Sequence, residues 1–426
     1  MSKLNLPMER IWNNGNLFFL FFSIRLLFVL IAGIDNHYSF VLDGTWLVSL
    51  GDRIAAGNFD LDIGRFIASP AFPFFVAVHK ILFGGHWALF LSLSQLILSS
   101  VSGIYFYKLA RLLFSVRAAN IAVLLYAVFP LTMYYVNTFS QETLFQCLLI
   151  IFLYYLVKGV FTQKAVDVIL SAVLFALCYL TKSHILLFSV FIPVYFLINI
   201  PDKKRAVTFS VIYGCVCMVI TSPWTLYNLK TQDVFTISSN GGKCLFYFGN
   251  TDAAYRSIVD LPKEGTNDYE LMKTRAYMLN RDTLRADSIF HLPQKVIQDA
   301  FFRDAVQWIK TEPKKFIELK VYDLFFFLLP GVSFRHYHFV PWLLSFLVSA
   351  PVYILGYMGI FYCLKKQFKI HFFSLALFIT MLLFSLIFYV QNRFRTITIE
   401  PVYLLYAGFA LEAVVHYFRF SPKSSE

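Results

Sequence analysis

Residues 371–390 read HFFSLALFITMLLFSLIFYV, a stretch without a single Asp, Glu, Lys or Arg. A helix of about 20 apolar residues is long enough to cross the hydrocarbon core of a bilayer. This stretch therefore predicts a transmembrane helix, and comparable apolar runs occur along most of the chain.

The composition of the whole chain agrees with this interpretation. Of its 426 residues, 58% are hydrophobic and 15% are charged, whereas soluble globular proteins are roughly 45–50% apolar and about 25% charged. Soluble enzymes, fibrous proteins and disordered regulators are excluded. A transmembrane β-barrel is excluded too, because its strands of about ten residues alternate between apolar and polar positions, and the runs here are continuous.

The apolar runs predict an all-α, polytopic integral membrane protein with about ten transmembrane helices. The predicted spans are 17–34, 86–107, 118–136, 142–157, 166–181, 184–199, 207–226, 342–363, 371–390 and 397–417. We expect one transmembrane domain over residues 1–426, with two larger extracytoplasmic regions at 35–85 and 227–341. Within them, segments 70–84 and 316–330 are predicted to lie in the outer membrane interface without crossing it.

The net charge of +12 is explained by membrane topology and does not require nucleic acid as a partner. Short loops rich in Lys and Arg stay in the cytoplasm. Such residues occur before the first predicted span, in alternate short loops and at the end of the chain: Lys3, Arg10, Lys108, Arg111, Arg117, Lys158, Lys164, Lys203, Lys204, Arg205, Lys365, Lys366, Lys369, Arg419 and Lys423. We therefore expect both termini in the cytoplasm. The absence of any Asn-x-Ser/Thr sequon favours a bacterial plasma (inner) membrane.

Polar residues are concentrated in the outer loops and at the outer helix ends, which predicts a site facing outward at the membrane surface. Asp43 opens a helical pattern in the first outer loop, and an acid there can simply cap the helix. The order of features after it is more specific. Asp43 is followed by an amphipathic segment at 44–56, Gly57-Asn58, Ser69-Pro70-Ala71-Phe72-Pro73 and Phe83-Gly84.

This order resembles the first outer loop of the GT-C glycosyltransferases, in the branch that contains protein O-mannosyltransferases and the aminoarabinose transferase of lipid A. The similarity continues along most of the chain. Its further motifs are Leu109 to Arg117, Phe129-Pro130, Ser140-Gln141-Glu142-Thr143-Leu144, Leu180-Thr181-Lys182, Pro223-Trp224 with Asn228, Ser239-Asn240-Gly241-Gly242, Gly249-Asn250, and Asn392-Arg393-Phe394-Arg395 with Pro401.

The resemblance implies a GT-C-like fold and a sugar donor linked to polyprenyl phosphate, with a glycan, lipid or protein as acceptor. The implied mechanism is inverting: a carboxylate of the first outer loop takes the proton of the acceptor as it attacks the anomeric carbon. Asp43 is the predicted catalytic base. A general base of this kind contributes roughly 10²–10⁴ in rate.

The departing phosphate needs cations where negative charge develops. The candidates are Arg65, Lys182, Arg393 and Arg395, all at predicted outer helix ends. Each could instead be an anchor in the membrane interface. Because Arg393 and Arg395 would not share one helix face, at most one of them is expected to reach the phosphate.

Glu142 and Asn250 complete the candidate site. Glu142 opens a predicted helix, where the helix dipole favours an acid whatever its function. Histidines 184, 336 and 338 have no companion acid at ligand spacing, so no metal site or cofactor is predicted. Two positions depart from the family: Gly44 stands where many members carry a second acid, and Ser69 where many carry a Lys.

Two other classes of protein have many membrane helices and stay open as alternatives. One is an O-antigen polymerase or ligase-like enzyme, and the other is a polysaccharide or lipid transporter. A transporter should carry charges inside its spans along the transport pathway, whereas a transferase needs Asp43 in the first outer loop.

Overall fold

The computed structural model of the chain describes residues 12–33, 43–64, 66–259, 292–332, 334 and 338–420. These segments are helical over most of their length, and the one strand-like pairing among them is an isolated bridge between Asp62 and Ile67. The predicted all-α fold is confirmed.

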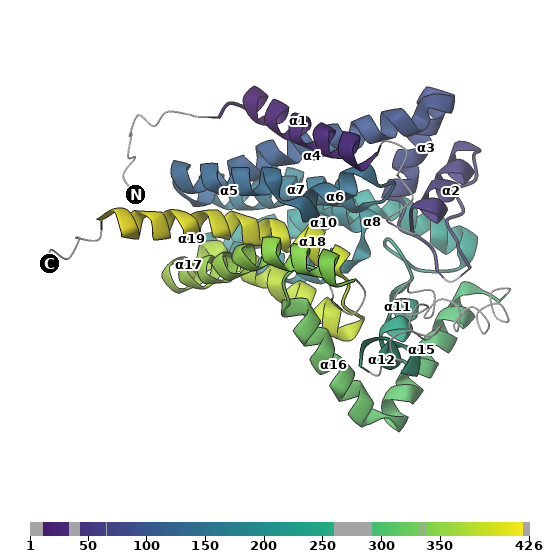
Figure 1. Cartoon of the computed structure of the whole chain (residues 1–426). Coiled ribbons are helices and arrows are strands. Elements are labelled where there is room, and N and C mark those ends of the chain that lie inside the picture. The colour runs from purple at the N-terminus through teal and green to yellow at the C-terminus, as the bar shows by residue number, and fades with distance from the viewer. Residues whose placement is uncertain are drawn as a thin grey trace.

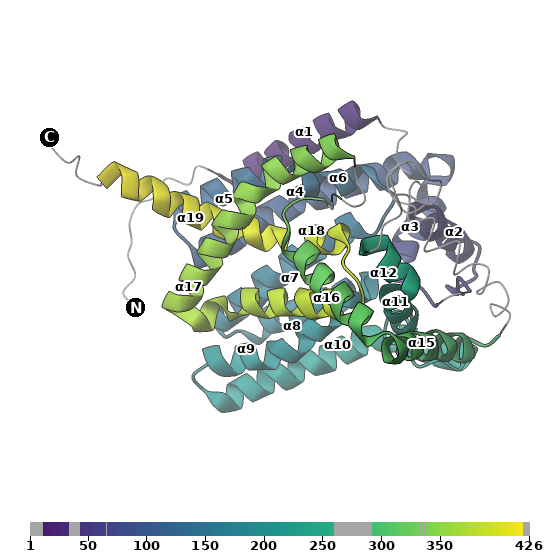
Figure 2. The same cartoon turned by 60° about the horizontal axis from the view of Figure 1, so that its bottom comes forward.

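One set of helices lies side by side in a single bundle (Figures 1 and 2). They are α1 (Asn14–Ala32), α4 (Trp87–Leu113), α5 (Val116–Val128), α7 (Glu142–Thr162), α8 (Ala165–Thr181), α9 (Phe191–Asn199), α10 (Lys203–Gln232), α17 (Phe339–Ile387) and α19 (Glu400–Phe420).

The other helices gather at one end of this bundle, which we call the capped end (Figure 1). They are α2 (Asp43–Ala55), α3 (Ala71–Phe83), α11 (Gly242–Gly249), α12 (Asp252–Ile258), α15 (Gln294–Thr311) and α16 (Pro313–Leu328). Short pieces complete the chain: η1 (Gly84–His86), α6 (Pro130–Tyr134), η2 (Tyr135–Asn137), η3 (Ser183–Val190) and α18 (Asn392–Thr398).

The basic loops lie together at the opposite end, which we call the basic-loop end. The Arg205 Nη2 group donates to the carbonyl oxygen of Gln163 at 2.6 Å, which joins two of these loops. The Asn199 side chain donates to the Lys369 carbonyl oxygen at 2.8 Å, which joins two more. The structure thus gathers at one end the loops that the charge pattern placed on one side of the membrane.

Helix α17 is two helices in series. Gln367 has the non-helical angles φ −141° and ψ 57°, and there the chain turns back on itself (Figure 2). The two halves correspond to the predicted spans 342–363 and 371–390. The first residue of α17, Phe339, and its last residue, Ile387, both lie towards the capped end (Figure 2).

The predicted number of about ten spans is not confirmed. Among the described residues, five helices are long and apolar enough to cross a membrane, or up to seven if two bent pairs each count as one span. Residues 165–199 account for part of the difference. The apolar run continues there, but α8 has only 17 residues and residues 183–199 are divided between a 3-10 helix and α9.

The two predicted interfacial segments do not run along the bundle as independent spans. Helix α3 folds back on the start of α4. The contact that shows this joins the His79 Nε2 atom to Ser94 Oγ, fifteen positions further on, at 2.8 Å. Helix α16 approaches the bundle obliquely from α15 at the capped end (Figure 1). Helix α17 also begins at that end, so α16 and the start of α17 lie on the same side of the bundle (Figure 1).

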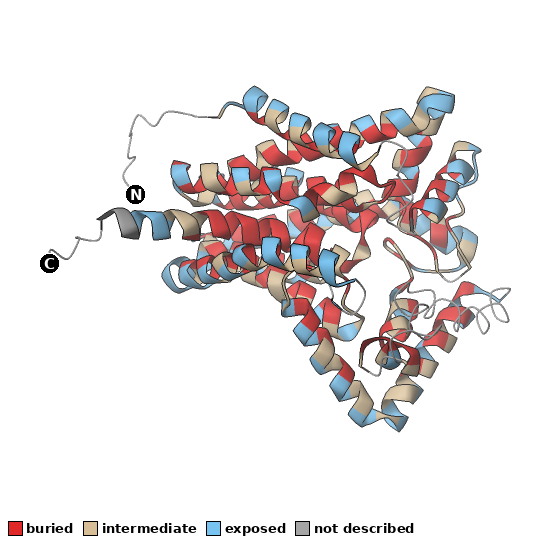
Figure 3. Ribbon diagram, viewed as in Figure 1, coloured by how far each residue is buried: buried red, intermediate tan, exposed pale blue. Residues whose placement is uncertain are grey.

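Apolar side chains lie both inside and outside the bundle. The interior is closely packed: a Cβ atom on Gly408 would lie 2.6 Å from the Cα atom of Ala122, so α19 and α5 meet almost backbone to backbone. Such contacts at small residues are typical of membrane helices. Outward-facing residues such as Ile31, Val219 and Phe361 are exposed, as the pale outer surfaces in Figure 3 show. An apolar outer surface of this extent requires lipid around it.

Candidate functional site

One apolar cluster links the first turn of α2 to the segments on either side of Glu142. Helix α2 begins at Asp43, whose side chain lies outside the part of the chain that the structure describes. One turn further on, Trp46 and Leu47 belong to an apolar cluster that also contains Phe139 and Leu144. These two residues flank Glu142, so the helix that begins at Asp43 and the segment that carries Glu142 contribute to the same apolar cluster.

Helices α2 and α3 are fixed to each other by close contact. A Cβ atom on Gly51 would lie 2.5 Å from the Val76 Cγ1 atom. A larger residue at position 51 would therefore force the two helices apart. The predicted phosphate ligand Arg65 lies between these helices in sequence and is outside the described residues.

Glu142, Lys182 and Arg393 form one ionic group, which we call the cation cluster. The Lys182 Nζ atom lies 2.7 Å from Glu142 Oε1, and their side chains are 2% and 1% exposed. The Arg393 Nη1 atom lies 3.9 Å from the same carboxylate oxygen, and the Arg393 side chain is 19% exposed. Two cations thus share a single carboxylate oxygen, and Arg393 is the more accessible of the two.

The cation cluster lies towards the capped end because of where its helices begin and end. Glu142 is the first residue of α7, and Lys182 directly follows the last residue of α8. The loop between these two helices contains Gln163 and lies at the basic-loop end, so Glu142 and Lys182 lie at the other end of the bundle. Arg393 is the second residue of α18, which packs on α7.

Aromatic rings and one histidine surround the cation cluster. The Lys182 Nζ atom lies 4.8 Å from the centre of the Phe394 ring, and the Arg393 guanidinium carbon lies 5.4 Å from it. His184 is buried between aromatic rings, and its Nε2 atom lies 2.9 Å from Thr398 Oγ1. The Arg393 Nε group donates to Gln391 Oε1 at 2.6 Å. The sequence did not single out Gln391, because a Gln in a polar turn carries no specific signal.

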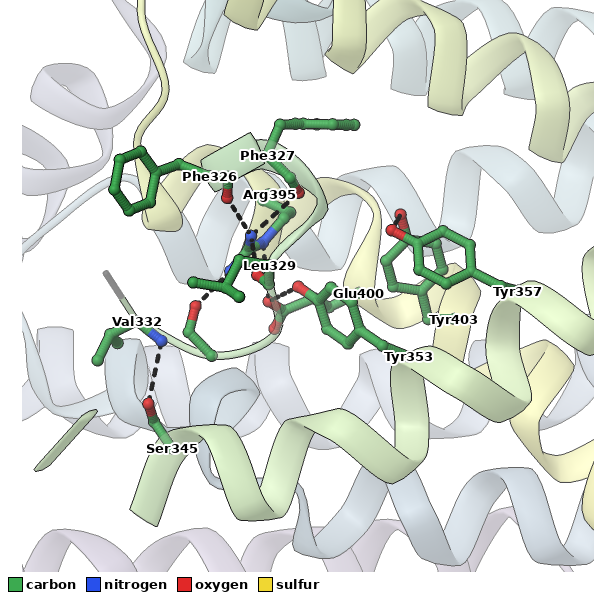
Figure 4. A network of polar contacts seen from close by, with 11 residues as sticks. Phe326, Phe327, Leu329, Val332, Ser345, Tyr353, Tyr357, Arg395, Glu400 and Tyr403 are labelled. Atoms are coloured by element: carbon green, nitrogen blue, oxygen red, sulfur yellow. Dashed lines mark hydrogen bonds and ion pairs between the residues drawn. The ribbon is translucent and has the colours of Figure 1, made fainter. Parts of the chain in front are cut away.

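Arg395 points away from the cation cluster, into the end of α16 (Figure 4). Its side chain is buried, and its Nη1 group donates to the carbonyl oxygens of Phe326 and Leu329 at 2.9 and 2.6 Å. Its Nε atom lies 3.5 Å from Glu400 Oε1. The two arginines therefore occupy different faces of α18, as the sequence predicted.

Asn250 lies at the end of α17 and not in the cation cluster. Its side-chain amide donates to the carbonyl oxygens of Phe246 and Ile387 at 2.7 and 2.9 Å. A Cβ atom on the preceding Gly249 would lie 1.5 Å from the Phe388 carbonyl oxygen. This close approach fixes the segment that leads into α18.

The two outer regions are joined by amide side chains. The Gln294 side chain donates to Asp62 Oδ1 at 2.7 Å and to the Gly64 carbonyl oxygen at 3.0 Å. Asn240 accepts a hydrogen bond from the Ile67 backbone at 2.6 Å. Burial raises the pKa of Asp62 above its ordinary value, although hydrogen bonds from Gly64 and Gln294 oppose the shift.

The next question is whether any His, Cys, Asp and Glu side chains lie close enough together to bind a metal ion. Among the described residues, no group of three His, Cys, Asp or Glu side chains is placed to hold a metal ion. His184 and His338 are described, and His336 is outside the described residues.

Comparison with known proteins gives a family match over one part of the chain and a fold match over nearly all of it. Residues 68–227 match the model of the dolichyl-phosphate-mannose-protein mannosyltransferase family. This segment includes Glu142 and Lys182. No curated protein sequence matches the chain.

Solved structures of the Archaeoglobus fulgidus oligosaccharyltransferase share the fold. The form tethered to an acceptor peptide with an NVT sequon is 13% identical, with a TM-score of 0.57 over 97% of this chain and 51% of that one. AglB from the same organism, in complex with an inhibitory peptide and a dolichol-phosphate, is 14% identical, with a TM-score of 0.52 over 95% of this chain and 51% of that one. The chain spans about half the length of these proteins.

A third structure, ArnT from Cupriavidus metallidurans bound to undecaprenyl phosphate, is 14% identical over 94% of this chain and 79% of that one. Its TM-score of 0.39 is too low to add to the argument. The chain has the fold of the GT-C membrane glycosyltransferases, as its sequence motifs predicted. Its residues 68–227 are in addition similar to the dolichyl-phosphate-mannose-protein mannosyltransferases.

Proposed function

We propose that the protein is a membrane glycosyltransferase that moves a sugar from a polyprenyl-phosphate-linked donor to an acceptor outside the cytoplasm. The acceptor is a glycan, a lipid or a protein. The GT-C fold and the mannosyltransferase family match support this class of reaction. The archaeal oligosaccharyltransferase of the same fold was solved with a dolichol-phosphate, a lipid of the proposed donor type.

The cation cluster is the observation that carries the proposal. A polyprenyl tail dissolves in the bilayer, so the phosphate attached to it lies near the headgroups, at one end of a transmembrane bundle. The cation cluster lies towards such an end, and Arg393 is accessible there. A guanidinium can donate two parallel hydrogen bonds to a phosphate, and it stabilises the charge that grows as the sugar departs.

Glu142 has a supporting role in this proposal. A lysine buried as deeply as Lys182 needs a carboxylate partner to stay charged. Glu142 supplies that partner at 2.7 Å and also lies near Arg393. It would hold both cations at a fixed separation, which favours binding of a phosphate at a defined position. Asn250 would support the same site from the end of α17.

Asp43 is the proposed catalytic base. It takes the proton from the acceptor hydroxyl or amine while that atom bonds to the anomeric carbon, and the bond from this carbon to the phosphate oxygen breaks. Polyprenyl phosphate leaves, and the configuration at the anomeric carbon is inverted. The start of α2 shares an apolar cluster with the residues that flank Glu142, which supports a base and a phosphate site at the same end of the bundle. Arg65 is a further proposed phosphate ligand.

We place the protein in the plasma membrane with the basic-loop end in the cytoplasm and the capped end outside. The positive-inside rule supports this orientation, because the basic loops lie together at one end of the bundle. Both termini are then cytoplasmic, and the site faces outward.

A donor assay tests the proposal. Purified protein in lipid is incubated with radiolabelled polyprenyl-phosphate mannose, galactose or aminoarabinose, together with a membrane extract that supplies acceptors. We expect one label to leave its lipid, and we expect Arg393→Ala to slow the transfer by more than about tenfold. Passage of intact labelled lipid between leaflets, with no cleavage, would instead identify a transporter.

A further inference from the structure

Helix α18 presents its two arginines to different parts of the molecule. Arg393 and Arg395 are two positions apart, and each residue of an α-helix advances by about 100°, so their side chains leave the helix about 200° apart. Arg393 faces the cation cluster. Arg395 faces the last turn of α16 and the segment that follows it (Figure 4).

Arg395 caps the end of α16. Its Nη1 group lies 2.9, 3.1 and 2.6 Å from the carbonyl oxygens of Phe326, Phe327 and Leu329, and its Nη2 group donates to the carbonyl oxygen of Gly331. The last carbonyl groups of a helix have no partner within the helix, and a cation at that end also interacts favourably with the helix dipole. One guanidinium supplies both interactions.

The segment after α16 is held from its other side by α17. The Val332 backbone donates to Ser345 Oγ at 3.0 Å. Gly331 has a φ of +75°, and a Cβ atom on it would lie 2.7 Å from Ser345 Oγ. Residues 329–332 are therefore confined between α17 and Arg395, which leaves the end of α16 little freedom to shift.

Arg395 is itself held in place by a buried network. The Tyr353 hydroxyl donates to Glu400 Oε1 at 2.7 Å, and the Arg395 Nε atom lies 3.5 Å from the same oxygen. The Arg395 guanidinium carbon also lies 5.2 Å from the centre of the Tyr353 ring. A side chain fixed by this many contacts can orient the short helix on which it sits.

We propose that Arg395 is a positioning residue: by fixing α18 to the end of α16, it sets the place of Arg393 in the site. The inference rests on the proposed function only in the role given to Arg393. Arg395 itself does not contact the phosphate. Helix α16 also packs on α12 and α15, so the position of the outer helices is transmitted through Arg395 to the phosphate site.

A double-mutant cycle separates this role from simple stabilisation. Arg395→Lys keeps the charge but loses the planar fork. Because a displacement of about 1 Å at a reacting site can reduce a rate by about 10²-fold, we expect Arg395→Lys to lower turnover by about 10- to 100-fold. In an Arg393→Ala background the same substitution should lower the residual turnover by less than about twofold. An equally large loss in both backgrounds would overturn the proposal.

Arg205→Gln is the matched control. Arg205 also donates to a main-chain carbonyl oxygen, but at the basic-loop end. We expect wild-type turnover in this variant. If Arg205→Gln lowered turnover as much as Arg395→Lys, the effect would be one of general stability and the inference would be wrong.

Hydrogen exchange gives a second readout that does not depend on activity. Arg395→Lys should accelerate amide exchange at 326–332 and at 392–398, with no change at the start of α7. Unchanged exchange at 392–398 would overturn the inference even if transfer were measured. Conversely, a wild-type protein that releases sugar from none of the donors would refute the proposed function, while faster exchange at 392–398 in Arg395→Lys would still support the coupling of α18 to α16.

Discussion

The buried ion pair between Glu142 and Lys182 gives a prediction for both stability and activity. Glu142→Gln keeps the shape of the side chain and removes its charge. The Lys182 Nζ atom then loses a partner at 2.7 Å, in surroundings where both side chains are at most 2% exposed. Removal of one partner from a buried pair costs about 3–5 kcal/mol of folding free energy. We expect a loss of that size in the free energy of unfolding of this variant in mixed detergent micelles.

An exposed ion pair in the same protein is the control. The side chains of Lys243 and Asp299 are 49% and 45% exposed, and exposed pairs contribute little to stability. Asp299→Asn should therefore leave the unfolding transition unchanged. If Glu142→Gln shifted the transition no more than Asp299→Asn, our account of the cation cluster as a fixed ionic group would be wrong.

The double variant Glu142→Gln with Lys182→Met separates stability from catalysis. It removes both charges, so the cost of an unpaired buried lysine disappears and much of the stability should return. Transfer should stay at least about tenfold below wild type, since the proposed phosphate site has lost one of its cations. Full activity in the double variant would limit the cation cluster to a structural role.

Four further predictions concern single sites. Asp43→Asn should abolish transfer without affecting folding, because an amide can still cap α2 but cannot take a proton; a retained turnover above about a tenth of wild type would exclude Asp43 as the base. Arg393→Lys should lower turnover at saturating donor about tenfold or more, and Arg393→Ala further, since an ammonium lacks the planar fork; wild-type turnover in Arg393→Lys would refute this role. Burial raises the pKa of Asp323 from 3.8 to about 6, so the folded state binds a proton more readily than the unfolded state and stability should fall as pH rises from about 4 to 6; Asp323→Asn should flatten that fall, and an unchanged pH profile would contradict it. A cysteine at Lys310 should react with an impermeant reagent from outside and one at Gln367 only after permeabilisation, and the reverse pattern would invert the proposed topology.

The sequence predicted the main features of the fold because they depend on local composition. Apolar runs mark the bundle helices, and the Lys and Arg pattern identified the loops that meet at one end. The number of spans was harder to predict. Whether residues 183–199 form one helix or a 3-10 helix followed by α9 depends on their neighbours, because apolar composition is the same in either case.

Three of the predicted site residues, Glu142, Lys182 and Arg393, meet in the cation cluster, but the contacts between them were not predicted. Glu142 and Lys182 are 40 positions apart and belong to separate motifs. Their ion pair depends on how α7 and α8 pack, which no local pattern specifies. Helical geometry correctly placed Arg393 and Arg395 on different faces. It could not show which of the two arginines points to the cation cluster. That choice depends on the end of α16, which lies 66 residues earlier in the chain.

The cap that Arg395 places on α16 recognises only main-chain oxygens, which are the same for every amino acid. The side chains at 326–330 take no part in these contacts, although Phe326 and Phe327 are buried, and Gly331, with its φ of +75°, is a further position that resists exchange. For protein engineering, a chimera that takes α11, α12 and α15 from a relative with another acceptor should be joined before residue 326. The recipient then keeps the carbonyl groups that, on our proposal, orient its phosphate site.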